Sequence, residues 1–89
     1  MWTWDEAKRR SNLAKHAVDF AAAEDFDWTT AVAEPDDRTD YGEVRIEVTG
    51  MIGARLHVMI LTPRGGGYRI ISLRKANSRE QGRWERLKR

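Results

Sequence analysis

The chain has 89 residues, a length that suits one domain with a modest core, and we take residues 1–89 as that single domain. It has no cysteine, no apolar run of membrane-spanning length and no signal-peptide pattern, which excludes disulfide chemistry and is compatible with a reducing cytoplasm. The net charge of +2 hides a split, because residues 1–63 carry 7 basic and 12 acidic side chains whereas residues 64–89 carry 9 basic and 2 acidic.

Two helices are predicted in the N-terminal third of the chain. Thr3 and Glu6 fit a capping box, which predicts a helix from there to about His16. Few apolar residues recur along this helix, so it should lie on the surface of the core. Asp19 is the candidate N-cap of a second, short helix that should end near Asp27.

Four strands are predicted from alternating hydrophobicity and from runs of β-branched residues. They cover residues 29–33, 43–49, 55–62 and 68–76. In the second strand Val44, Ile46 and Val48 should point inward. The third strand is apolar on both sides and should therefore be central in the sheet. Gly65–Gly67 predicts the hairpin turn before the last strand.

A last helix is predicted from near Asn77, where Asn77 with Glu80, or Ser78 with Gln81, supplies a second capping signal. These elements make an α+β domain in which N-terminal helices pack on one face of a four-stranded, mainly antiparallel sheet and a C-terminal helix follows. The expected core consists of Phe20, Phe26, Ile46, Val58 and either Ile70 or Ile71.

Several kinds of chemistry find no support in the sequence. His16 and His57 have no partner at metal-ligand spacing, so neither a metal nor another cofactor is expected. The glycine run after Arg64 lacks the Lys-Ser/Thr ending of a phosphate-binding loop. Ser72 has no evident His–Asp pair to activate it as a nucleophile. The basic side chains remain as the candidates for a functional site.

Basic residues are concentrated where the last strand meets the last helix. Arg69, Arg74, Lys75 and Arg79 lie within eleven residues, and alternation places Arg74 and Arg69 on opposite sides of the strand. Guanidinium groups suit phosphate because they offer paired donors at any relevant pH. RNA can be cleaved without a metal when its 2′-hydroxyl is the nucleophile and cations stabilise the phosphorane. Composition alone leaves such cleavage and simple binding of RNA or DNA equally open.

Four groups of residues occur in a recognisable order between Trp4 and Glu85. They are Trp4-Asp5-Glu6-Ala7-Lys8; Asn12-Leu13 with Lys15-His16 and Val18-Asp19-Phe20; Asp37-Arg38 with Tyr41-Gly42-Glu43 and Arg45; and Arg69-Ile70-Ile71-Ser72 with Arg74-Lys75-Ala76 and Arg79-Glu80. In this order they resemble the BrnT family, small toxins of bacterial type II toxin–antitoxin modules with a RelE-like ribonuclease fold. Ala17 stands where that family usually has glycine, so the first helix is expected to end differently.

The resemblance implies a cytoplasmic ribonuclease that arrests translation and requires no cofactor. It implies RNA as the substrate and a cognate BrnA-like antitoxin that holds the toxin inactive. Such antitoxins commonly carry a ribbon-helix-helix DNA-binding region, so operator DNA is expected to be bound only through the antitoxin. No membrane partner is expected.

The candidate site residues are carried over from the family motifs. The catalytic candidates are Lys15, Glu43, Arg45, Arg74 and Lys75, and the RNA-binding candidates are His16, Arg69, Ser72 and Arg79. The resemblance assigns Arg45 and Arg74 to the phosphate and the transition state, Lys15 and Lys75 to positioning or proton transfer, and Glu43 to the role of general base. The alternative is a non-catalytic module of the same fold that binds nucleic acid or an antitoxin. Substitution of these cations would mark such a module, and they are present.

Overall fold

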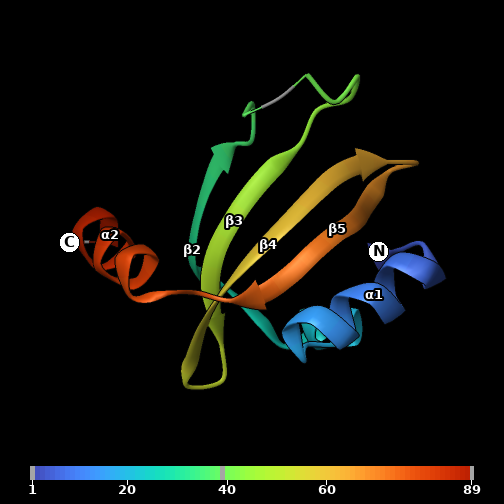
Figure 1. Ribbon diagram of the computed structural model, residues 1–89. Coiled ribbons are helices and arrows are strands. Elements are labelled where there is room, and N and C mark those ends of the chain that lie inside the picture. Colours follow the sequence, from blue (N-terminus) through green and yellow to red (C-terminus); the bar gives the residue numbers. More distant parts are fainter. Residues whose placement is uncertain (1, 39, 89) are drawn as a thin grey trace.

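The computed structural model describes residues 2–38 and 40–88 and contains a five-stranded sheet with helices beside it (Figure 1). The elements are β1 (Trp2–Thr3), α1 (Glu6–His16), the 3-10 helix η1 (Phe20–Asp25), β2 (Phe26–Pro35), β3 (Ile46–Ile52), β4 (Arg55–Arg64), β5 (Gly67–Lys75) and α2 (Ser78–Lys88). The strand order is β1-β5-β4-β3-β2, and β1 is the strand that pairs in parallel. The predicted α+β class is confirmed, and the predicted number of strands is wrong.

The strand missing from the prediction is β1, whose Trp2 and Thr3 pair with β5. Two residues are too few to show a period of two, so this strand leaves no pattern in the sequence. Because Thr3 belongs to β1, the N-cap of α1 is Asp5, whose carboxylate accepts hydrogen bonds from the N–H groups of Ala7 at 2.8 Å and Lys8 at 3.3 Å. The predicted cap at Thr3 is therefore wrong.

Helix α1 lies along the edge of β5, with Asn12 as its buried residue (Figure 1). The Asn12 amide donates to the carbonyl oxygens of Leu73 at 2.7 Å and Val18 at 3.0 Å, and its oxygen accepts from the N–H of Leu73 at 3.2 Å. The helix ends at Ala17, which is left-handed at φ 60° and donates its N–H to the Leu13 carbonyl. This is the end that glycine usually makes, so the expectation of a different end is wrong.

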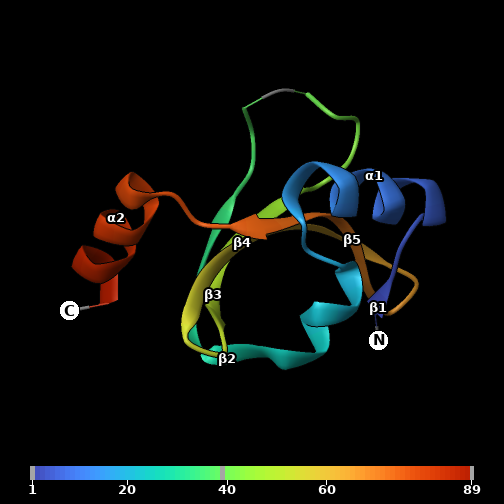
Figure 2. The same cartoon turned by 60° about the horizontal axis from the view of Figure 1, so that its bottom comes forward.

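The main core lies between η1 and one face of the sheet, which we call the inner face. The strands curve around η1 on this side (Figure 2). Asp19 caps η1 as predicted, through a hydrogen bond from the N–H of Ala21. The buried residues of this core are Val18, Phe20, Ala23, Phe26, Val48, Met59, Leu61, Ile70 and Leu73. Phe20, Phe26 and Ile70 are thus confirmed as core residues, whereas Ile46 is only half-buried.

Strand β4 is central, as its apolar faces predicted. Met59 and Leu61 face the inner core, and Leu56 and Val58 form a second cluster on the outer face of the sheet with Ala76. Each face of β4 therefore meets its own set of apolar side chains, which explains why this strand has no polar face.

Strands β2 and β3 both differ from their predicted bounds. β2 begins at Phe26, directly after η1, whereas β3 begins only at Ile46 and continues through Gly50 to Ile52. Val44 precedes β3 and is 68% exposed, so its predicted inward orientation is wrong. Its carbonyl accepts a hydrogen bond from the hydroxyl of Thr62 at 2.6 Å, which holds this segment against β4 outside the strand ladder.

A β-bulge in β5 changes which of its side chains share a face. Ile60 pairs with Ser72, but its neighbour Leu61 pairs with Ile70, so Ile71 is the extra residue. The side chains before Ile71 therefore point to the opposite faces from those that uninterrupted alternation with the residues after it would give. The predicted strict alternation along this strand is wrong, and this difference shapes the candidate site.

Helix α2 begins with the predicted capping box, because the Asn77 side chain accepts from the N–H of Glu80 and the Glu80 carboxylate accepts from the N–H of Asn77. The helix lies beside β2 at the sheet edge opposite α1 (Figure 1). Trp84 packs on the outer-face cluster and donates its indole N–H to the Thr30 carbonyl at 2.9 Å. In Figure 1 the outer face of the sheet lies open between α1 and α2.

Candidate functional site

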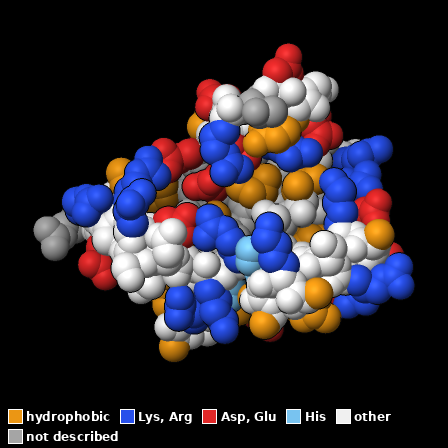
Figure 3. Space-filling model, in the orientation of Figure 1, with side chains coloured by type: hydrophobic (Ala, Val, Ile, Leu, Met, Phe, Trp, Pro, Cys, Tyr) orange, Lys and Arg blue, Asp and Glu red, His pale blue; other side chains and the backbone are white. Residues whose placement is uncertain are grey.

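Strand β5 presents three of the candidate residues on the outer face of the sheet. The bulge at Ile71 puts Arg69 in register with Thr62, on the face that also carries Ser72 and Arg74. Lys, Arg and His side chains gather on this side of the molecule between α1 and α2, with acidic side chains among them (Figure 3). Without the bulge, Arg69 and Arg74 would lie on opposite faces.

Arg74 is fixed by a two-pronged ion pair with Glu80 of α2. Its Nη1 and Nη2 donate to the two carboxylate oxygens at 2.8 and 2.7 Å, and Nη1 also contacts the Lys75 carbonyl at 3.3 Å. The pKa of the guanidinium is raised chiefly by the hydrogen bonds to Glu80, with a further contribution from the Glu47 carboxylate. Arg74 is therefore a permanently charged and well-oriented donor.

The last turn of α1 brings Lys15 and His16 to the end of β5 that holds Arg74. Burial lowers the pKa of the His16 imidazole below its usual 6.5, and the charges of Lys15 and Arg74 lower it further. His16 is consequently mainly neutral at pH 7, which leaves one ring nitrogen able to accept a proton.

The segment before β3 adds two more arginines. Arg38 donates from Nε and Nη2 to the carboxylate of Asp36 at 2.7 and 3.0 Å. These hydrogen bonds hold the pKa of Asp36 below its usual range. Arg45 pairs with Glu43 at 3.0 Å and lies over the ring of Tyr41, 3.9 Å from its centroid.

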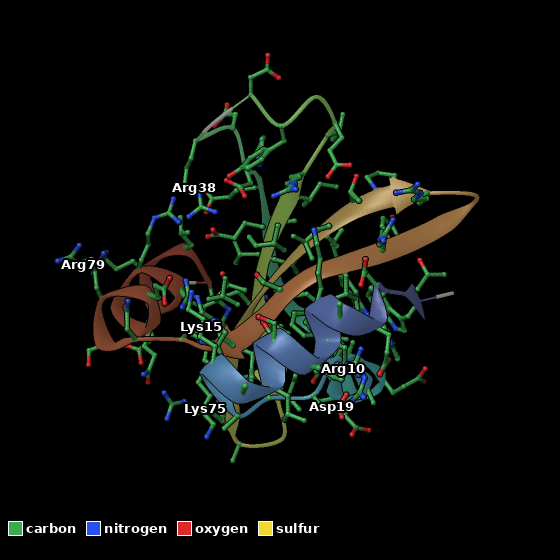
Figure 4. The ribbon with its side chains drawn as sticks, turned by 45° about the vertical axis from the view of Figure 1, so that its right-hand side comes forward. Arg10, Lys15, Asp19, Arg38, Lys75 and Arg79 are labelled. Atoms are coloured by element: carbon green, nitrogen blue, oxygen red, sulfur yellow. The ribbon has the colours of Figure 1, made fainter. Side chains whose placement is uncertain are left out.

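The candidate residues do not all lie together. Arg69, Ser72 and Arg74 share the outer face of β5, and Lys15 and His16 lie at the end of β5 that holds Arg74, whereas Glu43 and Arg45 pair with each other in the segment before β3. Lys75 is in register with His57 on the other face of β5, and Arg79 is an exposed residue that points away from α2 into solvent (Figure 4). The structure therefore does not bring Lys75 and Arg79 to the outer-face group.

Three charged residues near this site were missing from the sequence-based set. Arg38 and Glu80 both lie in the family motifs but were not among the site residues carried over, and Glu80 was also interpreted as part of a helix cap. The Glu47 carboxylate of β3 contributes to the charge environment of both Arg74 and Arg83. The ion pair of Asp36 with Arg38 could have been predicted from the sequence, because the two residues are separated by a single position.

Residues 2–38 and 40–88 contain no group of three or more His, Asp or Glu side chains arranged to hold a metal ion. In the same residues, no helix is both long enough and apolar enough to cross a membrane.

The mixed fold and the basic side chains on its outer face define a small α+β protein with a cationic surface. The family model for the BrnT ribonuclease toxin of type II toxin–antitoxin systems matches residues 4–80. The chain therefore belongs to the BrnT family of ribonuclease toxins. A comparison with curated proteins gave no significant match.

Proposed function

We propose that this protein is an endoribonuclease toxin that cleaves RNA without a metal ion and thereby inhibits translation. Membership of a ribonuclease toxin family supports the activity. One observation carries the chemistry. His16 has a lowered pKa, and the guanidinium of Arg74, which Glu80 fixes, lies near enough for its charge to contribute to that lowering. The first supplies a base at neutral pH and the second stabilises negative charge.

The proposed reaction is an attack by the RNA on its own backbone. The 2′-hydroxyl attacks the adjacent phosphorus while its proton passes to His16, and Arg74 stabilises the charge that grows on the non-bridging oxygens. The bond from phosphorus to the 5′-oxygen of the next nucleotide breaks, and that oxygen takes a proton from Lys15. The products are a 2′,3′-cyclic phosphate and a 5′-hydroxyl end.

The remaining candidates are assigned to RNA binding. Arg69, Ser72 and Arg45 would contact the backbone along the outer face, since charged and hydroxyl groups bind phosphate without regard to sequence. Glu43, considered from the sequence as a base, is better suited to orienting Arg45, with which it forms an ion pair. Lys75 and Arg79 would contribute at most to long-range attraction of RNA.

We further propose that a cognate BrnA-like antitoxin neutralises the toxin in the cytoplasm and carries a ribbon-helix-helix region, through which the complex binds operator DNA. Type II modules pair a toxin with a protein antitoxin, which supports such a partner. An acidic antitoxin segment would complement the basic outer face. We also propose that the fold is RelE-like, with the outer face as its active face.

The test is an RNA-cleavage assay in excess EDTA in which the product ends are identified. We expect cleavage to persist and to leave cyclic or 3′-phosphate ends with 5′-hydroxyl ends. Loss of cleavage in EDTA, or 3′-hydroxyl products, would contradict the mechanism. RNA binding without any cleavage, together with normal growth on induced expression without an antitoxin, would favour a non-catalytic binding module.

A further inference from the structure

The two carboxylate oxygens of Glu80 have different sets of partners. Oε1 accepts hydrogen bonds from the backbone N–H of Asn77 at 2.9 Å and from Nη1 of Arg74 at 2.8 Å. Oε2 accepts from Nη2 of Arg74 at 2.7 Å. A capping box needs only one side-chain acceptor at this position, and Glu and Gln both provide it. The cap therefore leaves the second oxygen to Arg74 and does not by itself require a charged residue.

The ion pair determines which donors of Arg74 remain for a ligand. Nη1 donates to Glu80 and also contacts the Lys75 carbonyl, so this nitrogen is directed at the protein. Within the part of the chain that the structure describes, no hydrogen bond engages Nε of Arg74. Nε and the second N–H of Nη2 form the side-on fork of the guanidinium, which matches two oxygens of a phosphate. Glu80 thus fixes the guanidinium with one fork still available.

Helix α2 is held in place by contacts of its own. Arg83 forms a two-pronged ion pair with Glu34 of β2, with 2.7 Å between Nη2 and Oε2. Trp84 donates its indole N–H to the Thr30 carbonyl of the same strand at 2.9 Å. These contacts attach the helix to β2, although the chain enters it from β5 (Figure 1). The helix therefore sets the position of Glu80 independently of the arginine that it binds.

Both members of the pair are partly sheltered from water. The side chain of Arg74 is 31% exposed and that of Glu80 is 25% exposed. Two parallel hydrogen bonds fix the plane of a guanidinium, and partial burial reduces the competition from water that weakens exposed ion pairs. Arg74 lies on the same face of β5 as Arg69 and Ser72, so the remaining fork belongs to the face that is proposed to bind RNA.

We propose that Glu80 is a positioning residue for RNA cleavage, which holds Arg74 so that its side-on fork meets the phosphate at which the chain is cut. This inference rests on the proposed function, because it takes RNA as the ligand. A donor that is already oriented stabilises the growing charge without reorganising during the reaction. If Glu80 instead competed with phosphate for Arg74, its removal would speed up cleavage.

The first experiment compares three variants in the RNA-cleavage assay. Glu80→Gln keeps an acceptor for the helix cap but removes the charge and one of the two acceptors of Arg74, so we expect kcat to fall roughly 10-fold, with a smaller change in KM. Asn77→Ala removes the side-chain half of the cap and keeps the ion pair, so it should lower the melting temperature without a comparable loss of kcat. Glu85→Gln removes one charge from an exposed position of the same helix and should not lower kcat.

A double-mutant cycle separates positioning from a general structural effect. Glu80→Gln is measured in the wild type and in Arg74→Ala. If Glu80 acts through Arg74, the substitution should cause no further loss of kcat once the arginine is gone, whereas a structural role predicts the same loss in both backgrounds. Thermal melts confirm that each variant is folded at the assay temperature. Where the wild type cleaves RNA, this cycle decides: an equal loss in both backgrounds, or unchanged or faster cleavage by Glu80→Gln, would overturn the inference and leave the nuclease intact.

A binding measurement keeps the inference testable if the wild type cleaves no RNA, a result that would refute the nuclease. The probe is a fluorescent 2′-O-methyl oligoribonucleotide, which has no free 2′-hydroxyl, and its binding is followed by fluorescence anisotropy. Loss of a negative charge alone predicts tighter binding, as expected for Glu85→Gln. Weaker binding by Glu80→Gln that disappears in the Arg74→Ala background would then support positioning. Unchanged or tighter binding by Glu80→Gln, or a wild type that does not bind the probe, would overturn it.

Discussion

The side chain of Asn12 pairs with both backbone polar groups of Leu73, at 2.7 Å to its carbonyl oxygen and 3.2 Å from its N–H. It does so on the edge of β5 beyond the two residues that β1 pairs. A side-chain amide thus replaces a strand at a sheet edge that would otherwise have unpaired groups. The same contact attaches α1, and with it Lys15 and His16, to the strand that carries Arg74.

Asn12→Ala should therefore destabilise the fold. Two buried backbone groups of Leu73 would lose their partner, which costs about 2–4 kcal/mol in the free energy of unfolding. Urea denaturation measures the change. Ser11→Ala, at an exposed position of the same helix, should change stability by no more than about 0.5 kcal/mol. Equal stabilities of the Asn12 and Ser11 variants would show that water replaces the amide without cost.

Ala17→Gly should stabilise the protein. Ala17 has a left-handed backbone at φ 60°, which disfavours any side chain with a Cβ. Relief of that strain exceeds the extra chain entropy of glycine, for a net gain of about 0.5–1 kcal/mol. Ala14→Gly, inside α1, should lose about 1 kcal/mol. Thermal melts of the two variants that shift in the same direction would contradict this account of the helix end.

Gly50→Ala should destabilise the sheet. A Cβ at this position would lie 2.6 Å from the ring of Phe26 and 3.1 Å from the hydroxyl of Thr30, so the Phe26 ring must move. Overpacking of this kind costs about 1–3 kcal/mol. Gly82→Ala gives the opposite expectation, a gain of up to about 1 kcal/mol, because Gly82 lies inside α2 with its nearest neighbour at 3.5 Å. Urea denaturation of both variants checks the difference in sign.

Glu80 should make stability depend on acid pH. Its hydrogen bonds from Arg74 lower the pKa of the folded carboxyl below its usual 4.5. The contribution is complete above the unfolded pKa and is lost as the pH falls through the folded pKa, so stability should decline from about pH 5 downward. Glu80→Gln should flatten this part of the pH profile in urea denaturation, with Glu85→Gln as the control for removing one carboxylate from α2. Parallel profiles for wild type and Glu80→Gln would refute the linkage.

Arg74→Ala should lower kcat for RNA cleavage roughly 100-fold or more, on the scale of losing one preorganised donor. Arg74→Lys should not restore the full rate, since lysine offers a point charge in place of a fork. Arg86→Ala removes an exposed cation from α2 and should weaken RNA binding only slightly. Unchanged kcat in Arg74→Ala would refute the assignment of the site while leaving family membership intact.

Local patterns predicted several elements correctly, and each success depended on neighbouring residues alone. The Asn77–Glu80 capping box begins α2, Asp19 caps η1, and the two-sided apolar pattern of β4 marks the central strand. The two-residue strand β1 and the bulge at Ile71 escaped prediction. A parallel pairing and an unpaired residue depend on the partner strand, which no local pattern records.

The sequence by itself determined the fold class, the family and the supply of cations near the C-terminus, because these follow from composition, periodicity and spaced motifs. Only the tertiary structure decided which cations share a face. The bulge places Arg69 on the same face as Arg74, the register places Lys75 on the other face, and an ion pair with Glu80 of α2 fixes the guanidinium of Arg74. Electrostatic interactions depend on the distance between charges in space. For residues on different elements, that distance is set only when the strands pair and the helices pack.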